Sequence, residues 1–284
     1  MQYTIQDIQS IIGAKGIVVE NTIIENLVID SRKIIFPNSS LFFALHSDRR
    51  DGHTFIEEAY QRGVRNFVVE KYFDFNKYPL ANFLLTNDSL EALQTLAAKH
   101  RSQFQYPVIG ITGSNGKTIV KEWLNQLLCD DYTIVRSPRS YNSQIGVPLS
   151  VWQMNEHHSL AIFEAGISKT GEMNHLQKII QPTIGILTNI GEAHSEGFTS
   201  DSEKLLEKTE LFSNAELIIY CKELISDENS LPAAARKISW SKNPDATVFI
   251  KHIVKKTTSS NLEIQYQQQN LTIDIPFIDD ASIE

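Results

Sequence analysis

Short apolar runs alternate with amphipathic segments through the middle of the chain. The apolar runs predict strands at 108–112, 133–135, 160–164, 184–187 and 217–220. Apolar residues that recur every three or four positions predict helices at 117–128, around 172–180 and at 202–212. Strands that alternate with helices are typical of a mostly parallel sheet covered by helices, so this region predicts an α/β fold.

The first hundred residues carry a second, smaller α/β pattern. Strands are predicted at 27–29, 41–44, 66–69 and 82–85, and helices at 5–12, 55–61 and 89–101. A polar stretch at 102–106 precedes Pro107 and the first strand of the larger region. We therefore expect one domain at 1–104 and a second domain at 105–284.

From residue 236 onward the pattern changes to an alternation of apolar and polar positions. It predicts antiparallel strands at 248–254, 262–266 and 271–277, with a turn at 258–261. The last six residues, 279–284, are similar to the start of a helix that does not continue. We expect a second domain with an added antiparallel β segment, incomplete at its C-terminal end.

Composition narrows the classes of function. Of the 284 residues, 42% are hydrophobic and 21% are charged, as in ordinary globular proteins. The net charge of −8 argues against nucleic acid or an anionic membrane as the main partner. The sequence shows neither a signal-peptide pattern nor an apolar run of membrane-spanning length. Cys129 and Cys221 lack metal-ligand spacing, so we expect buried free thiols in a reducing cytoplasm.

The strongest chemical signal is a glycine-bearing turn, Thr-Gly-Ser-Asn-Gly-Lys-Thr, at 112–118. Glycines let backbone N–H groups approach a polyphosphate, and the N-terminus of the following helix favours its negative charge. Lys117 is then placed to reach the terminal phosphates, and the Thr118 hydroxyl to bind a magnesium ion. Ile111 stands where the usual phosphate-loop pattern has its first glycine. The alternative is a plain turn that contains Gly-Lys-Thr.

Three further side chains belong to the same part of the predicted sheet. Glu164 ends a strand, where parallel sheets bind ligands, and its carboxylate suits a magnesium ion at Thr118. The next strand leads to Asn189 and His194, and Lys208 lies in the amphipathic helix that follows. Each of these residue types is also common in solvent on its own. Their combination indicates a site for phosphate and metal.

These motifs together resemble the Mur ligase family, the ATP-dependent amide-forming enzymes of bacterial peptidoglycan synthesis. The phosphate loop is followed in the family's order by Phe-Glu-Ala-Gly at 163–166, Thr-Asn-x-x-x-x-His at 188–194 and Lys-x-x-x-Phe at 208–212. The Lys-Glu pair at 121–122 and Gly-Glu-Met at 171–173 are similar to the family member that adds D-alanyl-D-alanine. The resemblance covers nearly the whole chain.

The resemblance implies a role for each motif residue. It implies that ATP is bound by Thr112, Gly113, Ser114, Asn115, Gly116, Lys117, Thr118 and Asn142. It implies that metal is held by Thr118, Glu164, His194 and Lys208, and that Lys117, Lys208 and His194 are catalytic. Lys208 matches a lysine that many members carbamylate, which turns a cation into an oxygen ligand beside magnesium. Ser140 and Ser143 replace two asparagines that the family often carries near Asn142.

The N-terminal half resembles the family's nucleotide-sugar domain. The resemblance implies that Asp30, Ser31, Arg32 and Arg49 bind substrate, with Ser31 and Arg32 near the UDP part. Arg49 is the candidate for contact with an anion, because a guanidinium suits phosphate and carboxylate. A turn capped by Asp30 is one alternative. For Asp-Gly-His at 51–53, the alternative is a turn before a helix.

The implied reaction joins the carboxylate of UDP-N-acetylmuramoyl-tripeptide to the amine of D-alanyl-D-alanine. It proceeds through an acyl phosphate and uses ATP and two Mg²⁺ ions. Full-length members carry a C-terminal domain that closes over ATP and brings the incoming amine, and this chain ends before it, so we expect the chain alone to have little or no ligase activity. Some members are fused to an alanine racemase. The alternatives are the family's third-residue-adding ligase, folylpolyglutamate synthase, a nucleotide-dependent switch or kinase, and a non-catalytic module that binds a UDP-sugar or ATP.

Overall fold

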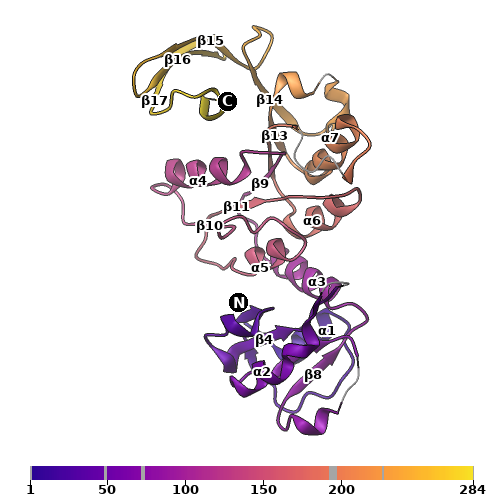
Figure 1. Cartoon of the computed structure of the whole chain (residues 1–284). Coiled ribbons are helices and arrows are strands. Elements are labelled where there is room, and N and C mark those ends of the chain that lie inside the picture. The colour runs from indigo at the N-terminus through magenta and orange to yellow at the C-terminus, as the bar shows by residue number, and fades with distance from the viewer. Residues whose placement is uncertain (1, 48–49, 72–73, 192–196, 226, 284) are drawn as a thin grey trace. The chain divides into compact units, whose positions relative to one another are not determined.

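The computed structural model describes residues 2–47, 50–71, 74–191, 197–225 and 227–283 (Figure 1). Its contacts divide the chain into two compact units. The first comprises Met1–Tyr106, Leu128–Phe163 and Lys178–Ile180, and the second comprises Pro107–Leu127, Glu164–Gln177 and Gln181–Glu284. Residues 128–163 thus group with the N-terminal segment, whereas the sequence places them in the second domain.

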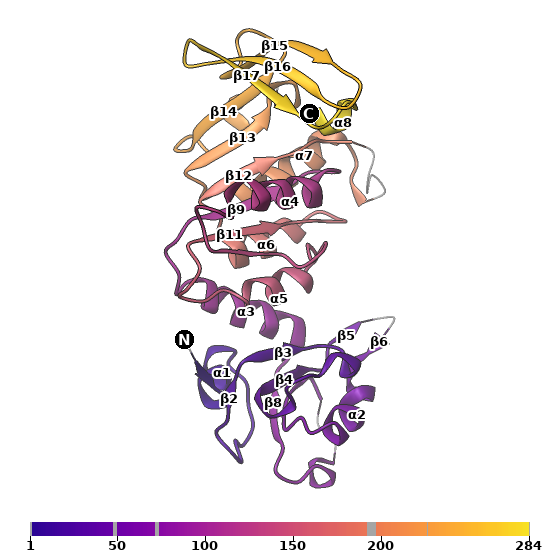
Figure 2. The same cartoon turned by 90° about the vertical axis from the view of Figure 1, so that its left-hand side faces the viewer.

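The first unit is built on a small parallel sheet. Its strands are β3 (Asn26–Val28), β4 (Ser40–Phe43), β7 (Asn66–Val69) and β8 (Asn82–Leu85), in that order. Side chains alternate between the two faces of a strand, so Leu41 and Phe43 join one apolar cluster and Phe42 the other. The first cluster includes side chains of α1 (Ile5–Ile11) and α3 (Ser89–Arg101), and the second those of α2 (Ile56–Gln61). Figure 2 shows α1 and α2 on opposite sides of these strands.

Local sequence explains where the helices of this unit begin. The Thr4 side chain accepts a hydrogen bond from the backbone N–H of Asp7, and the Asp7 carboxylate accepts one from Thr4, which closes a capping box. The Asp88 carboxylate caps α3 by accepting from the N–H groups of Leu90 and Glu91. Two short antiparallel pairs complete the N-terminal segment: β1 (Tyr3–Thr4) with β2 (Ile23–Ile24), and β5 (His46–Ser47) with β6 (Arg50–Asp51).

The remainder of the first unit comes from residues after the phosphate loop. Strand β10 (Ile134–Arg136) pairs in parallel with β11 (Leu160–Glu164). Helix α5 (Gly146–Val151) contacts α3, and Trp152 packs beside the rings of Tyr3 and His100. The sequence pattern did not predict α5, because Pro148 and the β-branched Val147 and Val151 are weak helix formers.

The second unit holds a longer sheet. Its parallel strands are, in spatial order, β9 (Val108–Thr112), β12 (Ile184–Leu187), β13 (Leu217–Cys221), β14 (Arg236–Ser241) and β15 (Val248–Lys255). Strands β16 (Ser260–Tyr266) and β17 (Gln269–Ile275) then continue it in antiparallel fashion. Helix α4 (Lys117–Leu128) lies on one face, and α6 (Glu172–Ile180) and α7 (Asp201–Thr209) lie on the other (Figure 1).

The α/β fold and the mostly parallel sheet are confirmed, and four details of the sequence prediction are wrong. The stretch from 236 includes a parallel strand, β14, and not only antiparallel ones. Ser260 and Asn261 lie in β16 rather than in a turn. The acidic end of the chain does continue into a short helix, α8 (Asp280–Ile283). The cysteines are not buried, since Cys129 is exposed just after α4 and Cys221 is intermediate.

Two glycines of the sheet allow neighbouring residues to pack closely against it. A Cβ on Gly185 of β12 would lie 2.3 Å from Cδ1 of Phe212, in the short 3-10 helix Glu210–Phe212 that continues α7. A Cβ on Gly110 of β9 would lie 2.9 Å from the Pro182 ring. Within the described ranges, no helix combines the length and apolarity needed to cross a membrane.

Candidate functional site

The predicted phosphate loop is the turn between β9 and α4. Gly113 has φ of +145° and Gly116 has φ of +81°, a region of backbone conformation that favours glycine. At Gly113 the space is also closed, because an added Cβ would lie 2.0 Å from Oγ1 of Thr188. The sequence pattern therefore reflects a real backbone requirement. The turn leads directly into the N-terminus of α4, whose positive dipole end attracts anions.

The loop after β12 holds the phosphate loop in shape. Asn189 accepts from the backbone N–H of Ser114 through its carbonyl and from that of Asn115 through Oδ1, both at 2.8 Å. The Thr188 hydroxyl donates to the Asn115 carbonyl at 2.6 Å. The Ser114 hydroxyl also exchanges hydrogen bonds with the backbone of Gly191. Two amides of the loop are thus engaged by the protein, and Asn189 acts as a brace for the loop.

Lys117 folds back over the phosphate loop. Its Nζ donates to the carbonyls of Gly113 at 2.8 Å and Ser114 at 3.1 Å. Burial lowers the pKa of Lys117, and the nearby Glu164 carboxylate opposes that shift. The ammonium group therefore lies where a phosphate at the loop would meet it.

Glu164 ends β11 as a fully buried carboxylate held by α4. Its Oε2 accepts from the Thr118 hydroxyl at 2.9 Å, and its Oε1 lies 2.8 Å from Nζ of Lys121. The side chains of Lys121 and Glu164 are both 0% exposed. Nζ of Lys121 is also 3.2 Å from the half-exposed Glu122 carboxylate. The predicted meeting of Thr118 and Glu164 thus occurs within the second unit.

Lys208 reaches the phosphate loop from the opposite side. Its buried Nζ donates to the Gly113 carbonyl at 3.1 Å, the same oxygen that Lys117 contacts. Burial, with repulsion from Lys117 and Lys204, lowers the pKa of Lys208 to about 8. Lys204, also buried, donates to the Gly191 carbonyl at 2.6 Å. Three lysines therefore converge on the loops that follow β9 and β12.

Thr118 and Glu164 offer a hydroxyl and a carboxylate oxygen at one place, and such hard donors suit Mg²⁺. Mg²⁺ binds proteins through few side chains and completes its shell with phosphate oxygens and water. Among the described residues, no three or more His, Cys, Asp or Glu side chains form a group that could hold a metal ion. His194, the predicted ligand for a second ion, lies outside the described residues.

The structure gives less direct support for two other residues that were predicted to bind ATP. Thr112 is buried in β9 and donates its hydroxyl to the Ala165 carbonyl at 3.0 Å, so its side chain joins β9 to the segment after β11. Asn142 belongs to the first unit, and its contact with a γ-phosphate stays a prediction. Lys121 and Lys204 were not among the predicted residues. Each lies four positions from a predicted lysine, which puts it on the same helix face.

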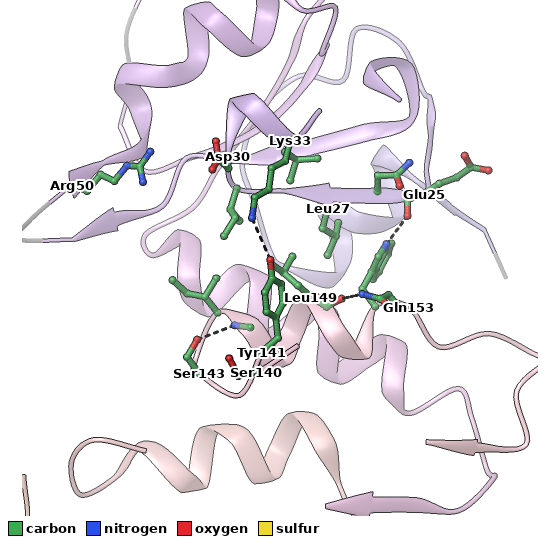
Figure 3. A pocket seen from close by; sticks show the side chains of 16 residues that line it. Glu25, Leu27, Asp30, Lys33, Arg50, Ser140, Tyr141, Ser143, Leu149 and Gln153 are labelled. Atoms are coloured by element: carbon green, nitrogen blue, oxygen red, sulfur yellow. Dashed lines mark hydrogen bonds between the residues drawn. The ribbon is translucent and has the colours of Figure 1, made fainter. Parts of the chain in front are cut away.

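A cavity of about 580 Å³ lies in the first unit (Figure 3). This volume falls within the range of about 300–1,000 Å³ that is usual for small-molecule pockets. The lining residues come from β3 and the residues on either side of it, from the 140–153 segment, and from β6, which contributes Arg50. Lys33 and Arg50 supply positive charge, and Tyr141 and Trp152 supply aromatic surface. Nζ of Lys33 donates to the Tyr141 hydroxyl at 3.3 Å, as Figure 3 shows.

The predicted substrate residues divide between this cavity and its surroundings. Asp30 lines the cavity, and its ion pair with Arg32, at 2.8 Å, holds the pKa of the Asp30 carboxyl well below its usual range. The Ser31 hydroxyl is buried and donates to Glu58 at 2.8 Å. Arg49 lies outside the described residues. Arg50, its neighbour in sequence, lines the cavity and lies over the Phe55 ring.

The Asp-Gly-His stretch forms a turn before a helix, as its alternative interpretation held. Nε2 of His53 accepts from the Glu70 backbone N–H at 3.0 Å. Nδ1 therefore carries the proton and donates to the Asp51 carboxylate at 2.6 Å. Asp51 also accepts from the His53 backbone N–H at 2.9 Å and caps the 3-10 helix Gly52–Phe55. The imidazole has both nitrogens engaged in fixing this turn.

Comparisons with known proteins agree with the geometry. Residues 111–284 match the Mur ligase middle domain. A UDP-N-acetylmuramoyl-tripeptide–D-alanyl-D-alanine ligase from Rickettsia prowazekii is 34% identical over 278 residues, which cover 93% of this chain and 60% of the relative. A MurF crystal structure from Acinetobacter baumannii superimposes on 100% of this chain and 62% of its own, with a TM-score of 0.88 and 25% identity.

A MurF structure from Thermotoga maritima in complex with ADP shares the fold. It is 24% identical, covers 91% of this chain and 60% of its own, and has a TM-score of 0.80. The chain thus spans less than two thirds of the length of each of these three proteins.

Proposed function

Because this chain belongs to the Mur ligase family and is of the MurF type, we propose that it carries the ATP and nucleotide-sugar sites of a peptide ligase. The ligase would add D-alanyl-D-alanine to UDP-N-acetylmuramoyl-tripeptide in peptidoglycan precursor synthesis. The observation that carries the proposal is the convergence of Lys117, Thr118, Glu164 and Lys208 around one turn. ATP as a co-substrate places the reaction in the cytoplasm.

The proposed chemistry must first activate a carboxylate. An oxygen of the tripeptide carboxylate forms a bond to the γ-phosphorus of ATP, and the bond to the ADP oxygen breaks. The amine of D-alanyl-D-alanine then attacks the acyl carbon, and phosphate leaves as the amide forms. Two anions must meet in the first step, so positive charge and positioning supply much of the catalysis.

The residues of the second unit fit these requirements. Lys117 would bind the terminal phosphates, and the N-terminus of α4 would favour their charge. Thr118 and Glu164 would hold Mg²⁺, which when bound offsets the charge of the phosphates. Lys208, with a pKa of about 8, would be the lysine that reacts with carbon dioxide to give a carbamate. His194 and Asn142 would complete the site as a ligand for a second Mg²⁺ and as a γ-phosphate contact.

The cavity of the first unit would hold the nucleotide-sugar. Lys33 and Arg50 suit a diphosphate, and the aromatic surface of Tyr141 suits a base or sugar face. Asp30 offers a carboxylate that can accept hydrogen bonds from ring N–H or hydroxyl groups. Arg49 stays a proposed anion contact. Ser31 and Arg32 would act indirectly, since Ser31 donates to Glu58 and Arg32 pairs with Asp30.

Separate binding measurements test the proposal. Calorimetry on the chain should detect both ADP and UDP-N-acetylmuramoyl-tripeptide, and Lys117→Met should weaken ADP binding while leaving the nucleotide-sugar unaffected. Tripeptide binding without ADP binding would favour the non-catalytic module. ADP binding without nucleotide-sugar affinity would favour a switch or kinase. A preference for the nucleotide dipeptide over the tripeptide would favour the ligase that adds the third residue.

A further inference from the structure

Strand β17 has one edge that no neighbouring strand covers. Among the described residues it is the last strand of the longer sheet, and six of its seven residues are exposed. The described segment that follows it leads back toward the other strands. The Phe277 carbonyl accepts from the Ser260 hydroxyl in β16, and Asp280 pairs with Lys255 in β15 at 2.7 Å. This segment therefore leaves the outer edge of β17 open.

The open edge carries a defined row of backbone groups. The two central residues of the hairpin turn between β16 and β17 have φ of +49° and +64°, as in a type I′ turn. Such a turn closes with a hydrogen bond from the N–H of Gln269 to the Tyr266 carbonyl. Inward-facing and outward-facing backbone groups then alternate along β17. The residues whose N–H and C=O groups point away from β16 are Asn270, Thr272 and Asp274.

β17 lacks the features that usually keep an edge strand from pairing. Natural sheets protect their edges with proline, lysine or a bulge. The sequence at 269–275 has no proline or lysine, and β17 pairs with β16 without a register shift. Leu271 and Ile273 lie on one face and are 43% and 44% exposed, whereas Leu262, opposite Ile273 on β16, is only 8% exposed. The apolar face of the sheet thus stays open at β17.

The sequence of β17 is complementary to itself when two copies run in opposite directions. An antiparallel pair centred on Thr272 places Leu271 of one copy opposite Ile273 of the other. It places Asn270 opposite Asp274, so that no charge faces a like charge. All the outward-pointing backbone groups then find partners. A shifted register would leave some of them opposite the hairpin turn or opposite the proline at 276, which has no N–H.

The polar side chains supply the donor and the acceptor that this register needs. Lys251 donates to Oδ1 of Asn270 at 2.6 Å, which among the described residues leaves the Asn270 amide group as a donor. Lys256 and Asn261 both donate to Oδ1 of Asp274 at 3.2 Å, which leaves Oδ2 as an acceptor in the same part of the chain. In the antiparallel pair each amide group meets the carboxylate of the other copy.

We propose that β17 pairs with β17 of a second copy of this chain, antiparallel and centred on Thr272, so that two sheets join across a two-fold axis. The pairing uses none of the residues assigned to ATP or to the nucleotide-sugar, so it is tested separately from the proposed function. A single pair of seven-residue strands buries less surface than a stable dimer needs. The association is therefore weak and depends on protein concentration.

Sedimentation velocity of the 284-residue chain, from about 5 to 300 µM, measures this association. We expect a shift from monomer to dimer as the concentration rises. Thr272→Lys puts two like charges opposite each other and should weaken the dimer by about fivefold or more. Thr257→Lys, at an exposed position between β15 and β16, is the matched control and should associate as the wild type does.

Disulfide trapping tests the register. Opposite residues that exchange hydrogen bonds have Cα atoms about 5.5 Å apart, which a disulfide can span. With Cys129 and Cys221 replaced by serine, Thr272→Cys should cross-link to itself under mild oxidation. Asn270→Cys should not, because the two copies of this position lie four residues, or about 14 Å, apart. A mixture of Asn270→Cys and Asp274→Cys should cross-link.

A chain that stays monomeric over the whole range of concentrations would overturn the proposal and leave the edge to a partner of another sequence. Growth beyond the dimer would also overturn it, because a two-fold contact closes on itself. A dimer without the Thr272→Cys cross-link, or a Thr272→Lys variant that associates as the wild type does, would place the interface elsewhere on the chain. If circular dichroism shows that Thr272→Lys is unfolded, the cysteine variants decide the question.

Discussion

Lys208 should destabilise the protein at neutral pH, and its removal should stabilise it. A buried cation surrounded by other cations costs free energy, which the folded state avoids only by releasing the proton. Lys208→Met keeps the length and apolar volume of the side chain and removes the charge. The Gly113 carbonyl keeps a partner in this variant, because Lys117 also donates to it at 2.8 Å.

The magnitude follows from the pKa. Lowering the pKa of Lys208 from 10.5 to about 8 corresponds to a penalty of about 3 kcal/mol once the group is protonated in both states. Between these two pKa values the unfolded state binds more protons than the folded state, so stability rises with pH. The penalty on folding stability is complete below pH 8 and vanishes above the pKa that Lys208 has in the unfolded state. After the lost hydrogen bond is counted, Lys208→Met should gain about 1–3 kcal/mol at pH 7.

Urea denaturation from pH 6.5 to 10.5, in buffer freed of carbon dioxide, measures this gain. The difference between Lys208→Met and the wild type should be constant up to about pH 8 and then decline. Lys99→Met, at an exposed position of α3, is the matched control and should show no pH-dependent difference. A Lys208→Met variant that is less stable than the wild type at pH 7 would refute the reasoning. Added bicarbonate should stabilise the wild type and leave Lys208→Met unchanged, because a carbamate converts the cation into an anion among lysines.

Three further perturbations test other parts of the structure. Gly185→Ala should lower the free energy of unfolding by about 1–3 kcal/mol, because its Cβ would overlap the Phe212 ring. Gly171→Ala is the control: its Cβ would meet no neighbouring atom, so any loss of stability reports only the φ of +87° at that position. Arg50→Ala should weaken calorimetric binding of UDP-N-acetylmuramoyl-tripeptide by about tenfold or more, as loss of a charged hydrogen bond does, and equal affinity would exclude Arg50 from the site. Burial lowers the pKa of His100 below 6.5, so the unfolded state takes up its proton first and stability should fall as the pH drops below 6.5. His100→Gln should flatten that loss in urea titrations between pH 7 and 5, and an unchanged slope would contradict it.

The phosphate loop and the carboxylate at the end of β11 can be predicted from the sequence, because the signals for both are local. Gly113 and Gly116 are needed by backbone conformations that few other residues adopt, so the phosphate loop is visible as a motif. Glu164 is visible because a buried strand ends on it, and the ends of parallel strands bind ligands. The strands β4, β7, β9 and β11 are buried runs, and each was predicted to within one or two residues.

The residues that were missed depend on contacts between distant parts of the chain. Lysines on helices are mostly solvated, so nothing in the sequence around Lys121 or Lys204 shows that they are buried. Their burial is accompanied by contacts with residues far away in the sequence, Glu164 for Lys121 and the Gly191 carbonyl for Lys204. The burial of the Ser31 hydroxyl against Glu58 is hidden in the same way, because the pair is formed across 27 positions.

Phosphate release by the complete gene product is the most direct test of the central claim. ATP, Mg²⁺, UDP-N-acetylmuramoyl-tripeptide and D-alanyl-D-alanine are supplied together or with one omitted, and released phosphate is measured. The account predicts release only when all are present, with loss of release in Lys117→Met and Lys208→Ala. Release that persists without the nucleotide tripeptide or without D-alanyl-D-alanine would contradict it.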